Sequence, residues 1–349
     1  MAYADISEAL ELSTKIQKNF KNRFWAWEKL LGSGTNGFTI LMSLHDEFKS
    51  SHCRVAFKFA SGFGQQQELR SEAAMLKELN GAKHIVSILG YCVHAGTAGD
   101  KEDTGILSNV PPSTAFGSFQ INHAPVLALE YLELGDLYSL VVIRAVVGMA
   151  YPIAAEIGTP PILEEIGDDD DPRAIVHGDI HDQNVMFSTS DGIPEHVLVP
   201  ILKVIDFGLA RDLDQLGFGL EEEEKNIGWQ RNLQDMANQI MAMIPVGQAF
   251  PLDGVVDYRG LPTRAEEILV REGGTDIRHP WLCPELRDLL ARCLYEDQEQ
   301  RPGLREVLEI ARKAVLTKTA FSFPEPGFET DDAIRSFAQE FFFDATAST

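Results

Sequence analysis

The stretch that decides the fold runs from Ala174 to Phe187 and reads AIVHGDIHDQNVMF. Apolar residues at both ends enclose a polar segment that contains Asp179 and, five positions later, Asn184. Further along, the run LKVIDFGLA is apolar and strand-like until it reaches Asp206. Two carboxylates and an amide therefore follow one another along the chain, each beside a short segment that a hydrophobic core can hold in place.

These three polar side chains suit the transfer of a phosphoryl group. A carboxylate such as that of Asp179 can orient an attacking hydroxyl group and accept its proton. Asn184 and Asp206 offer hard oxygen atoms, which are the ligands that Mg²⁺ prefers, and Mg²⁺ neutralises the charge of phosphates. The sequence thus predicts Asp179 as a catalytic base and Asn184 and Asp206 as metal ligands.

The pattern H-x-D-x-x-x-x-N followed by D-F-G resembles the catalytic core of eukaryotic-type protein kinases, with an atypical H-G-D catalytic loop. The resemblance implies an α+β class and a two-lobed protein kinase-like fold, with a small β-rich N-lobe and a larger, mainly helical C-lobe. It also implies that the protein binds ATP and Mg²⁺ and transfers the γ-phosphate to a hydroxyl group. Serine or threonine of an unidentified protein is the expected acceptor. The expected domains are an N-terminal helical extension (1–23), the N-lobe (24–132), the C-lobe (133–320) and a C-terminal tail (321–349).

Three glycines lie between two strand-like runs in residues 25–42, WAWEKLLGSGTNGFTILM. Gly32, Gly34 and Gly37 follow the order G-x-G-x-x-G, and glycine lets backbone N–H groups approach phosphate oxygen atoms without a Cβ in between. A dinucleotide-binding site would need a helix directly after the glycines, whereas the residues that follow are strand-like. The pattern therefore favours the phosphate-covering hairpin of a kinase, although taken alone it fits a plain hairpin equally well.

A lysine and a glutamate are expected to form an ion pair in the N-lobe. The run Arg54–Lys58 reads RVAFK and resembles the V-A-I-K strand of protein kinases, whose lysine holds phosphates of ATP. The spacing of apolar residues from Gln65 to Asn80 predicts a helix. On that helix Glu72 matches the glutamate that pairs with the lysine in kinases, and Glu68 is the second candidate. Because a charged lysine is usually exposed, replacement of Lys58 is expected to leave the fold intact.

The strand-like run from Val126 to Leu129 leads into a Gly-Asp turn and resembles the hinge between two kinase lobes. The resemblance implies that backbone groups near Glu130 and Leu132 meet the adenine of ATP. It further implies that Leu129 forms a wall of the adenine pocket and that Asp136 reaches the ribose. The residues themselves show only a strand that runs into a turn.

Two departures from the kinase pattern leave other functions open. Gly178 replaces an arginine that normally binds a phosphate on the activation segment, so control by phosphorylation of that segment is not expected. His181 stands where a lysine cation usually faces the transferred phosphoryl group, which makes it a candidate catalytic residue beside Asp179, Lys58 and Glu72. The H-G-D-x-H pattern is also similar to small-molecule kinases such as aminoglycoside and choline phosphotransferases. A kinase for a small hydroxyl compound and a nucleotide-binding pseudokinase scaffold therefore remain alternatives.

The expected C-lobe shows a third departure from the kinase pattern and two further resemblances to it. No A-P-E sequence occurs between Asp206 and Asp235, so the segment that grips a peptide substrate in kinases is expected to be reduced. Asp235 stands where the family places a buried aspartate that anchors the backbone of the catalytic loop. Arg301 matches the D-x-x-x-R-P ending of the family but lacks the usual glutamate partner, which one of Glu221–Glu224 could replace.

Several regions carry no chemical motif. Residues 95–124 are rich in Gly, Pro, Ser and Thr and predict an inserted surface loop, and residues 158–173 predict a second loop. The apolar stretch from Leu137 to Ile157 contains charged residues and a proline, which favours a buried helix over a membrane span. The phenylalanines near the C-terminus, Phe337 and Phe341 to Phe343, are expected to pack as part of a terminal helix.

Composition limits the partners of the protein. The chain has 349 residues, a net charge of −23 and an apolar fraction of 44%, which is typical of a globular protein. The negative balance argues against nucleic acid or an anionic membrane as a main partner. The four cysteines form no C-x-x-C pair and no signal peptide is evident, so we expect reduced thiols and a soluble cytoplasmic protein. The sequence does not reveal the oligomeric state.

Overall fold

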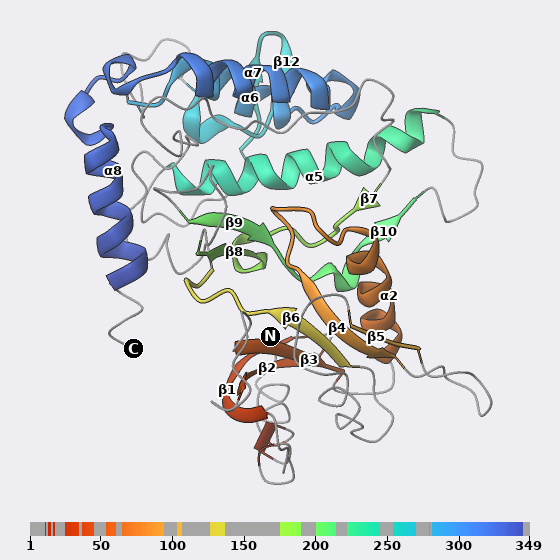
Figure 1. Cartoon of the computed structure of the whole chain (residues 1–349). Helices are drawn as coiled ribbons and strands as arrows, with labels where there is room; N and C mark the ends of the chain where they lie inside the picture. The colour runs from red at the N-terminus through yellow and green to blue at the C-terminus, as the bar shows by residue number, and fades with distance from the viewer. Residues whose placement is uncertain are drawn as a thin grey trace. The chain divides into compact units, whose positions relative to one another are not determined.

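The computed structural model divides the chain into two compact units with mixed α and β content (Figure 1). The first unit combines Met1–Leu132 with Lys203–Ala210, and the second combines Glu133–Leu202 with Arg211–Thr349. The predicted domains are continuous ranges that put Lys203–Ala210 into the C-lobe, whereas the structure groups this segment with the first unit. The described residues are 11, 13–14, 17, 25–34, 37–44, 54–60, 65–93, 103–106, 126–136, 175–189, 200–213, 222–244, 254–269, 279 and 281–344.

An antiparallel sheet with the strand order β1-β2-β3-β6-β4-β5 forms the centre of the first unit. Its strands are β1 Trp25–Gly34, β2 Gly37–Leu44, β3 Arg54–Phe59, β4 Ile88–Val93, β5 Asp103–Ile106 and β6 Val126–Glu130. The predicted hairpin around the glycines and the predicted strand that carries Lys58 are confirmed. The prediction of a loop over residues 95–124 is wrong at β5, because Asp103–Ile106 pairs with β4. The sequence did not indicate this strand, since the run Asp-Thr-Gly-Ile shows no alternation of apolar residues.

Side chains that alternate along β2 and β3 form a hydrophobic core on one face of this sheet. Lys58 stands between two of these core residues in the chain, so its side chain points to the opposite face. Helix α2 (Gln65–Glu78) contacts β4 and β6 and buries one helix face, which includes Glu72. The core cluster contains Trp25, Phe38, Ile40, Met42, Leu44, Val55, Phe57, Phe59, Leu89, Val126 and Ala128.

Short strand pairs and helices build the described part of the second unit. β7 (Ile175–Val176) pairs antiparallel with β10 (Arg211–Asp212), and β8 (Val185–Ser188) pairs with β9 (Ile201–Val204). The chain passes from the second unit into the first within β9. The remaining elements are α5 Glu222–Met243, β11 Val256–Tyr258, β12 Leu261–Thr263, α6 Pro284–Cys293, α7 Leu304–Thr317, α8 Asp331–Ala338 and a π-helical turn Gln339–Phe343.

The long helix α5 confirms the helix predicted around Asp235, and it packs against α6 through a cluster that includes Met241 and Leu290. α8 and the π-helical turn confirm the predicted terminal helix. Single-turn 3₁₀ helices complete the described elements. They span Asp182–Asn184, Phe207–Leu209, Glu266–Ile268, Gln298–Gln300, Ala320–Ser322 and Pro326–Phe328.

Some predictions fall outside the described residues, namely the buried helix from Leu137 to Ile157 and the loop over residues 158–173. Of the predicted N-terminal helix, residues 11, 13, 14 and 17 are described and helical. The indole Nε1 of Trp27 donates a hydrogen bond to Ser13 Oγ at 3.3 Å, which joins this helix to β1. None of the helices in the described ranges combines the length and the apolar character that a membrane crossing requires.

Candidate functional site

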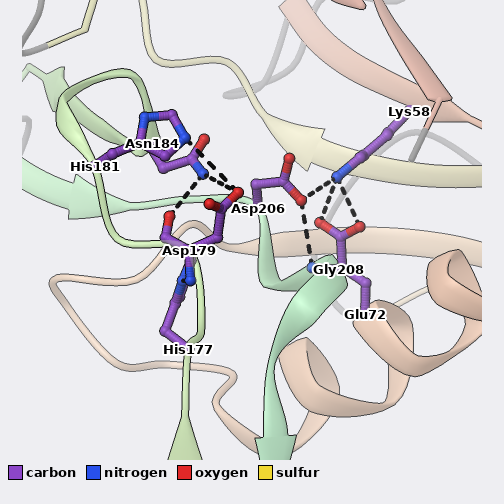
Figure 2. A network of polar contacts seen from close by, with 8 residues as sticks. All are labelled: Lys58, Glu72, His177, Asp179, His181, Asn184, Asp206 and Gly208. Carbon is purple, nitrogen blue, oxygen red and sulfur yellow. Dashed lines mark hydrogen bonds and ion pairs between the residues drawn. The ribbon is translucent and has the colours of Figure 1, made fainter. Parts of the chain in front are cut away.

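Three charged side chains of the first unit meet at Lys58 (Figure 2). Lys58 Nζ donates to both carboxylate oxygens of Glu72, at 3.0 Å to Oε1 and 2.8 Å to Oε2. It also donates to Asp206 Oδ1 at 2.7 Å. Lys58 comes from β3 and Glu72 from α2, so the predicted partner Glu72, rather than Glu68, makes the ion pair.

This ion pair is buried, which contradicts the expectation of an exposed lysine. The side chain of Lys58 is 9% exposed and that of Glu72 is not exposed at all. Burial alone would lower the pKa of Lys58, but the carboxylates of Glu72 and Asp206 outweigh it and the pKa is raised. Burial raises the pKa of Glu72, and Lys58 opposes that rise. Lys58 therefore remains a cation held against two carboxylates inside the protein.

Asp206 is placed by an unusual backbone conformation at the end of β9. Its φ of 60° and ψ of 70° lie in the left-handed region, which aspartate tolerates better than most residues. Its Oδ1 accepts a hydrogen bond from the N–H of Gly208 at 3.3 Å and so caps the turn Phe207–Leu209. This turn contacts α2. A non-glycine residue in this conformation is a sign of a functional site, because the surrounding structure must hold it there.

A second polar group surrounds Asp179 in the second unit (Figure 2). The amide Nδ2 of Asn184 donates to the backbone carbonyl of Asp179 at 2.9 Å and to its Oδ2 at 3.2 Å. Asn184 is 7% exposed, whereas the side chain of Asp179 is 42% exposed. Because the nitrogen of Asn184 is used in these bonds, its Oδ1 is the atom left to accept a donor or a cation.

The side chain of His181 caps the turn Asp182–Asn184. Its Nδ1 accepts a hydrogen bond from the N–H of Gln183 at 3.2 Å, which requires that nitrogen to carry no proton. The other ring nitrogen, Nε2, lies 3.7 Å from Asp179 Oδ2, and Nδ1 lies 3.6 Å from Asp182 Oδ1. The geometry therefore fits a residue that shapes the loop and faces the Asp179 carboxylate, rather than the fixed cation that a lysine would supply at this position.

Gly178 adopts a conformation that other residues disfavour. Its φ is 81°, in the left-handed region. The turn brings the N–H of Asp179 to the ring of the buried His177, to which it donates at Nδ1 over 3.3 Å. An arginine at position 178 would be strained by this backbone conformation.

Asn232, and not Asp235, anchors the backbone ahead of Asp179. Its Nδ2 donates to the carbonyl of Ile175 at 2.7 Å, and its Oδ1 accepts from the N–H of His177 at 2.9 Å. Asp235 lies one turn further along α5 and accepts a hydrogen bond from Arg231 at 3.2 Å. The prediction of Asp235 as the anchor is therefore wrong. The sequence could not separate the two residues, because both lie on one helix and spacing alone does not give the rotation of that helix.

The strand end predicted as a hinge is held by a second buried ion pair. Glu130 Oε1 accepts from Lys203 Nζ at 2.6 Å and from the N–H of Ser87 at 2.6 Å. The backbone N–H of Glu130 donates to the carbonyl of Ser87 at 3.0 Å, so it is already used. Lys203 and Ser87 were not predicted from the sequence as partners of Glu130. The signal for Lys203 is its place in the apolar run LKVID, because a lysine that is buried needs a partner for its charge.

The other residues predicted for the adenine and ribose are placed as follows. Leu129 and Leu132 are buried in the first unit, at 7% and 4% exposure. Asp136 belongs to the second unit and forms an isolated antiparallel bridge with Met186 of β8. Leu129 thus has the buried setting expected of a pocket wall, and Asp136 lies beside the strand that follows Asn184.

The three glycines of the predicted phosphate loop differ in their surroundings. Gly32 and Gly34 end β1, and an added Cβ would meet open space at either position. Gly37 begins β2 with a φ of 138°, and an added Cβ would collide with the carbonyl oxygen of Phe59. Gly37 is therefore required by the close approach of two backbones, whereas Gly32 and Gly34 leave the backbone open to a ligand.

Arg301 is a buried cation whose described hydrogen bonds go to backbone carbonyls. Nε donates to Tyr295 at 2.9 Å and Nη1 donates to Gln230 at 3.2 Å, and burial lowers the pKa of Arg301. The suggested partners, Glu221–Glu224, lie outside the residues whose side chains are described. The role of Arg301 that the structure supports is to join the end of α6 to α5.

The donor atoms suit magnesium that is held mainly by a substrate. Within the described ranges, no group of three or more His, Cys, Asp or Glu side chains could hold a metal ion. Mg²⁺ commonly uses one or two protein oxygens together with phosphates and water. Asn184 in the second unit and Asp206 in the first each offer oxygen of the type that Mg²⁺ prefers.

Comparison with models of known protein families gives no match for this chain, and neither does comparison with curated proteins.

Proposed function

We propose that this protein is an ATP-dependent phosphotransferase with a two-lobed protein kinase-like fold, which transfers the γ-phosphate of ATP to a hydroxyl group. The observation that carries the proposal is the buried Lys58, which bonds to Glu72 and Asp206 at once. The serine or threonine of a protein is the proposed acceptor.

The Lys58 group is better suited to binding than to stability. Burial of an ion pair costs desolvation free energy that the attraction between the charges often fails to recover. Buried groups with strongly perturbed pKa values also gather at functional sites. Lys58 is fixed by two carboxylates on a rigid sheet and helix, which is how a site holds a cation in place for a phosphate.

Asp179 is the proposed base. Its carboxylate is exposed enough to meet an incoming hydroxyl group, and Asn184 fixes it from one side. The backbone before it is pinned by Asn232 and turned by Gly178. In phosphoryl transfer the enzyme contributes mainly position and electrostatics, so a carboxylate held in this way orients the hydroxyl group and accepts its proton.

Magnesium would neutralise the charge of the phosphates when it is bound with ATP. Asn184 would offer its Oδ1 to the ion, since its nitrogen is held by Asp179. Asp206 would offer a carboxylate oxygen to the ion. In the structure Asp206 Oδ1 lies 2.7 Å from Lys58 Nζ, so Lys58 would compete with the ion for this oxygen.

A small hydroxyl compound is the second candidate acceptor. The observation that favours it is the loop itself, with a left-handed Gly178 and a capping His181 that match the H-G-D-x-H pattern of small-molecule kinases.

The test is transfer from labelled ATP to protein, peptide and small hydroxyl acceptors in parallel. Asp179→Asn should abolish transfer but keep Mg-ATP binding, whereas Asp206→Asn should also lose Mg²⁺-dependent binding, measured by thermal shift. Wild-type protein that binds Mg-ATP without transferring phosphate would favour the pseudokinase scaffold. Wild-type protein that binds no nucleotide would overturn the proposal.

A further inference from the structure

The last described residues of the chain pack onto β8. This strand follows the loop from His177 to Asn184, here called the catalytic loop because it carries the proposed base Asp179. α8 begins after Thr330, whose hydroxyl accepts a hydrogen bond from the N–H of Ala333 at 3.3 Å, and it ends in the π-helical turn Gln339–Phe343. Phe342 in this turn is 2% exposed. Its ring centroid lies 4.8 Å from that of Phe187 in β8, with the ring planes tilted by 52°. An aromatic contact thus joins the C-terminal segment to β8.

Both ends of the catalytic loop enter the same cluster. Ile180 follows Asp179 in the chain and Val185 follows Asn184, and both pack with Phe342. The polar side chains of Asp179 and Asn184 bond to each other, while their apolar neighbours lie in the cluster that the C-terminal segment closes. The cluster contains Val185, Phe187, Ala338 and Phe342, surrounded by Leu134, Ile180, Leu202, Met243, Phe337, Phe341 and Phe343.

The π-helical turn lets consecutive phenylalanines reach this cluster. Successive residues of an α-helix point about 100° apart, so three in a row rarely share one contact surface. Here Phe341, Phe342 and Phe343 all contact the cluster. The ring centroid of Phe337 lies 4.6 Å from that of Phe341, in a tilted arrangement, and 6.3 Å from that of Phe342, in an edge-to-face arrangement. π-helical turns are rare and are often found at functional sites.

We infer that the segment from Thr330 to Asp344 is a positioning element of the catalytic loop, with Phe342 as its central positioning residue. Phe342 touches no reactant and acts through its contacts with Phe187 and the neighbours of the two polar residues. The inference rests on the proposed function for its effect on catalysis. Lys58 and Glu72, around which ATP is proposed to bind, belong to the first unit, whereas Asp179 and Asn184 belong to the second. Loss of Phe342 therefore lowers turnover, and it weakens nucleotide binding less, through Asn184 alone.

The experiment compares Phe342→Ala and Phe342→Leu with Phe328→Ala, a matched control on a side chain that is 65% exposed. Amide hydrogen exchange is followed by mass spectrometry in peptides that cover residues 179–188 and in peptides that cover α2. Phe342→Ala should speed exchange in residues 179–188 and leave α2 protected. It should lower kcat on the order of tenfold to a hundredfold and change KM for ATP by a clearly smaller factor, since small misplacements reduce catalysis strongly. Phe342→Leu should recover part of both losses, and Phe328→Ala should match wild type.

Unchanged exchange in residues 179–188, or exchange that rises equally in α2, would overturn the inference. If Phe342→Ala does not fold, Phe342→Leu decides by the same criteria. If wild-type protein transfers no phosphate at all, the proposed function fails, and the exchange comparison still decides whether Phe342 holds the loop.

Discussion

Lys58 and Asp206 are separated by 148 positions in the chain, yet Lys58 Nζ lies 2.7 Å from Asp206 Oδ1. The contact joins the strand β3 to the segment that enters the first unit from β9. The same lysine is shared with Glu72, whose carboxylate is fully buried. Lys58 is therefore a structural residue of the first unit as well as the proposed phosphate-binding residue.

Lys58→Met should destabilise the protein in a way that depends on pH. It leaves Glu72 buried without its cation, which raises the pKa of that carboxyl further above the ordinary value of 4.5. A raised pKa in the folded state gives stability that is complete below 4.5 and is lost as the pH rises through the folded-state pKa. We expect a loss of about 3–5 kcal/mol at pH 8 and a smaller loss at pH 5, measured by urea unfolding.

The double variant Lys58→Met/Glu72→Gln is the control for this explanation. It removes the unpaired buried charge, so it should be more stable at pH 8 than Lys58→Met alone. Equal losses at both pH values, or no recovery in the double variant, would show that the buried charge is not the cause.

Gly178→Ala and Gly178→Arg should each lose about 1–2 kcal/mol of stability, because a φ of 81° places the new Cβ in the left-handed region. Gly178→Asn should lose less, since asparagine tolerates this conformation. Gly327→Ala serves as the control, because an added Cβ there meets open space. Thermal unfolding measures the series. A Gly178→Arg variant as stable as wild type would contradict the backbone explanation for the missing arginine.

Asn232→Ala should release the backbone ahead of Asp179. It removes the donor to Ile175 and the acceptor for His177, which leaves two backbone groups without their partners and costs about 1–3 kcal/mol. The amide hydrogen of His177 should exchange faster, and transfer should fall. Asp235→Asn tests the residue first predicted for this role and should leave the exchange of His177 unchanged. The opposite ranking of the two variants would restore Asp235 as the anchor.

The sequence reveals local elements more readily than long-range partners. Alternation of apolar residues suffices for the hairpin of β1 and β2, and helical spacing suffices for α2. Glu72 could be matched to Lys58 because a strand motif and a helix register both point to it. The choice between Asn232 and Asp235 could not be made, because three residues apart on α5 they differ only by the rotation of the helix in the folded protein.

Residues that are far apart in the chain and meet only in the folded protein are harder to predict from the sequence. The run of phenylalanines near the C-terminus predicts packing, but their contact with Phe187 depends on how the chain returns to β8. In the sequence Gly178 is noticed as a glycine where kinases usually have an arginine. The φ of 81° in the structure shows why glycine is favoured at this position. The apolar neighbours of Lys203 in the sequence indicate that its charge needs a partner. That the partner is Glu130 is known only from the structure.

Lys203→Met should destabilise the end of β6. The ion pair with Glu130 is nearly buried, with side chains 9% and 15% exposed, so the remaining carboxylate keeps only the N–H of Ser87. We expect the double variant Lys203→Met/Glu130→Gln to recover part of the loss, with a coupling free energy of about 0.5–3 kcal/mol. Urea unfolding of the four proteins of this cycle measures the coupling. Strictly additive losses would show that the pair does not act as a unit.

His181 separates two accounts of the loop from His177 to Asn184, which is proposed to be catalytic. In the structure its Nδ1 accepts the N–H of Gln183, so a proton on that nitrogen would break the cap. Asparagine is a good capping residue, whereas lysine has no acceptor and would lose the cap at a cost of about 1 kcal/mol. We therefore expect His181→Asn to keep both thermal stability and transfer close to those of wild type. His181→Lys should be less stable and no more active, although it carries the cation found in most kinases. If His181→Lys transfers phosphate faster than wild type at pH 8 while His181→Asn is inactive, charge at this position matters more than the cap, and the capping account is wrong.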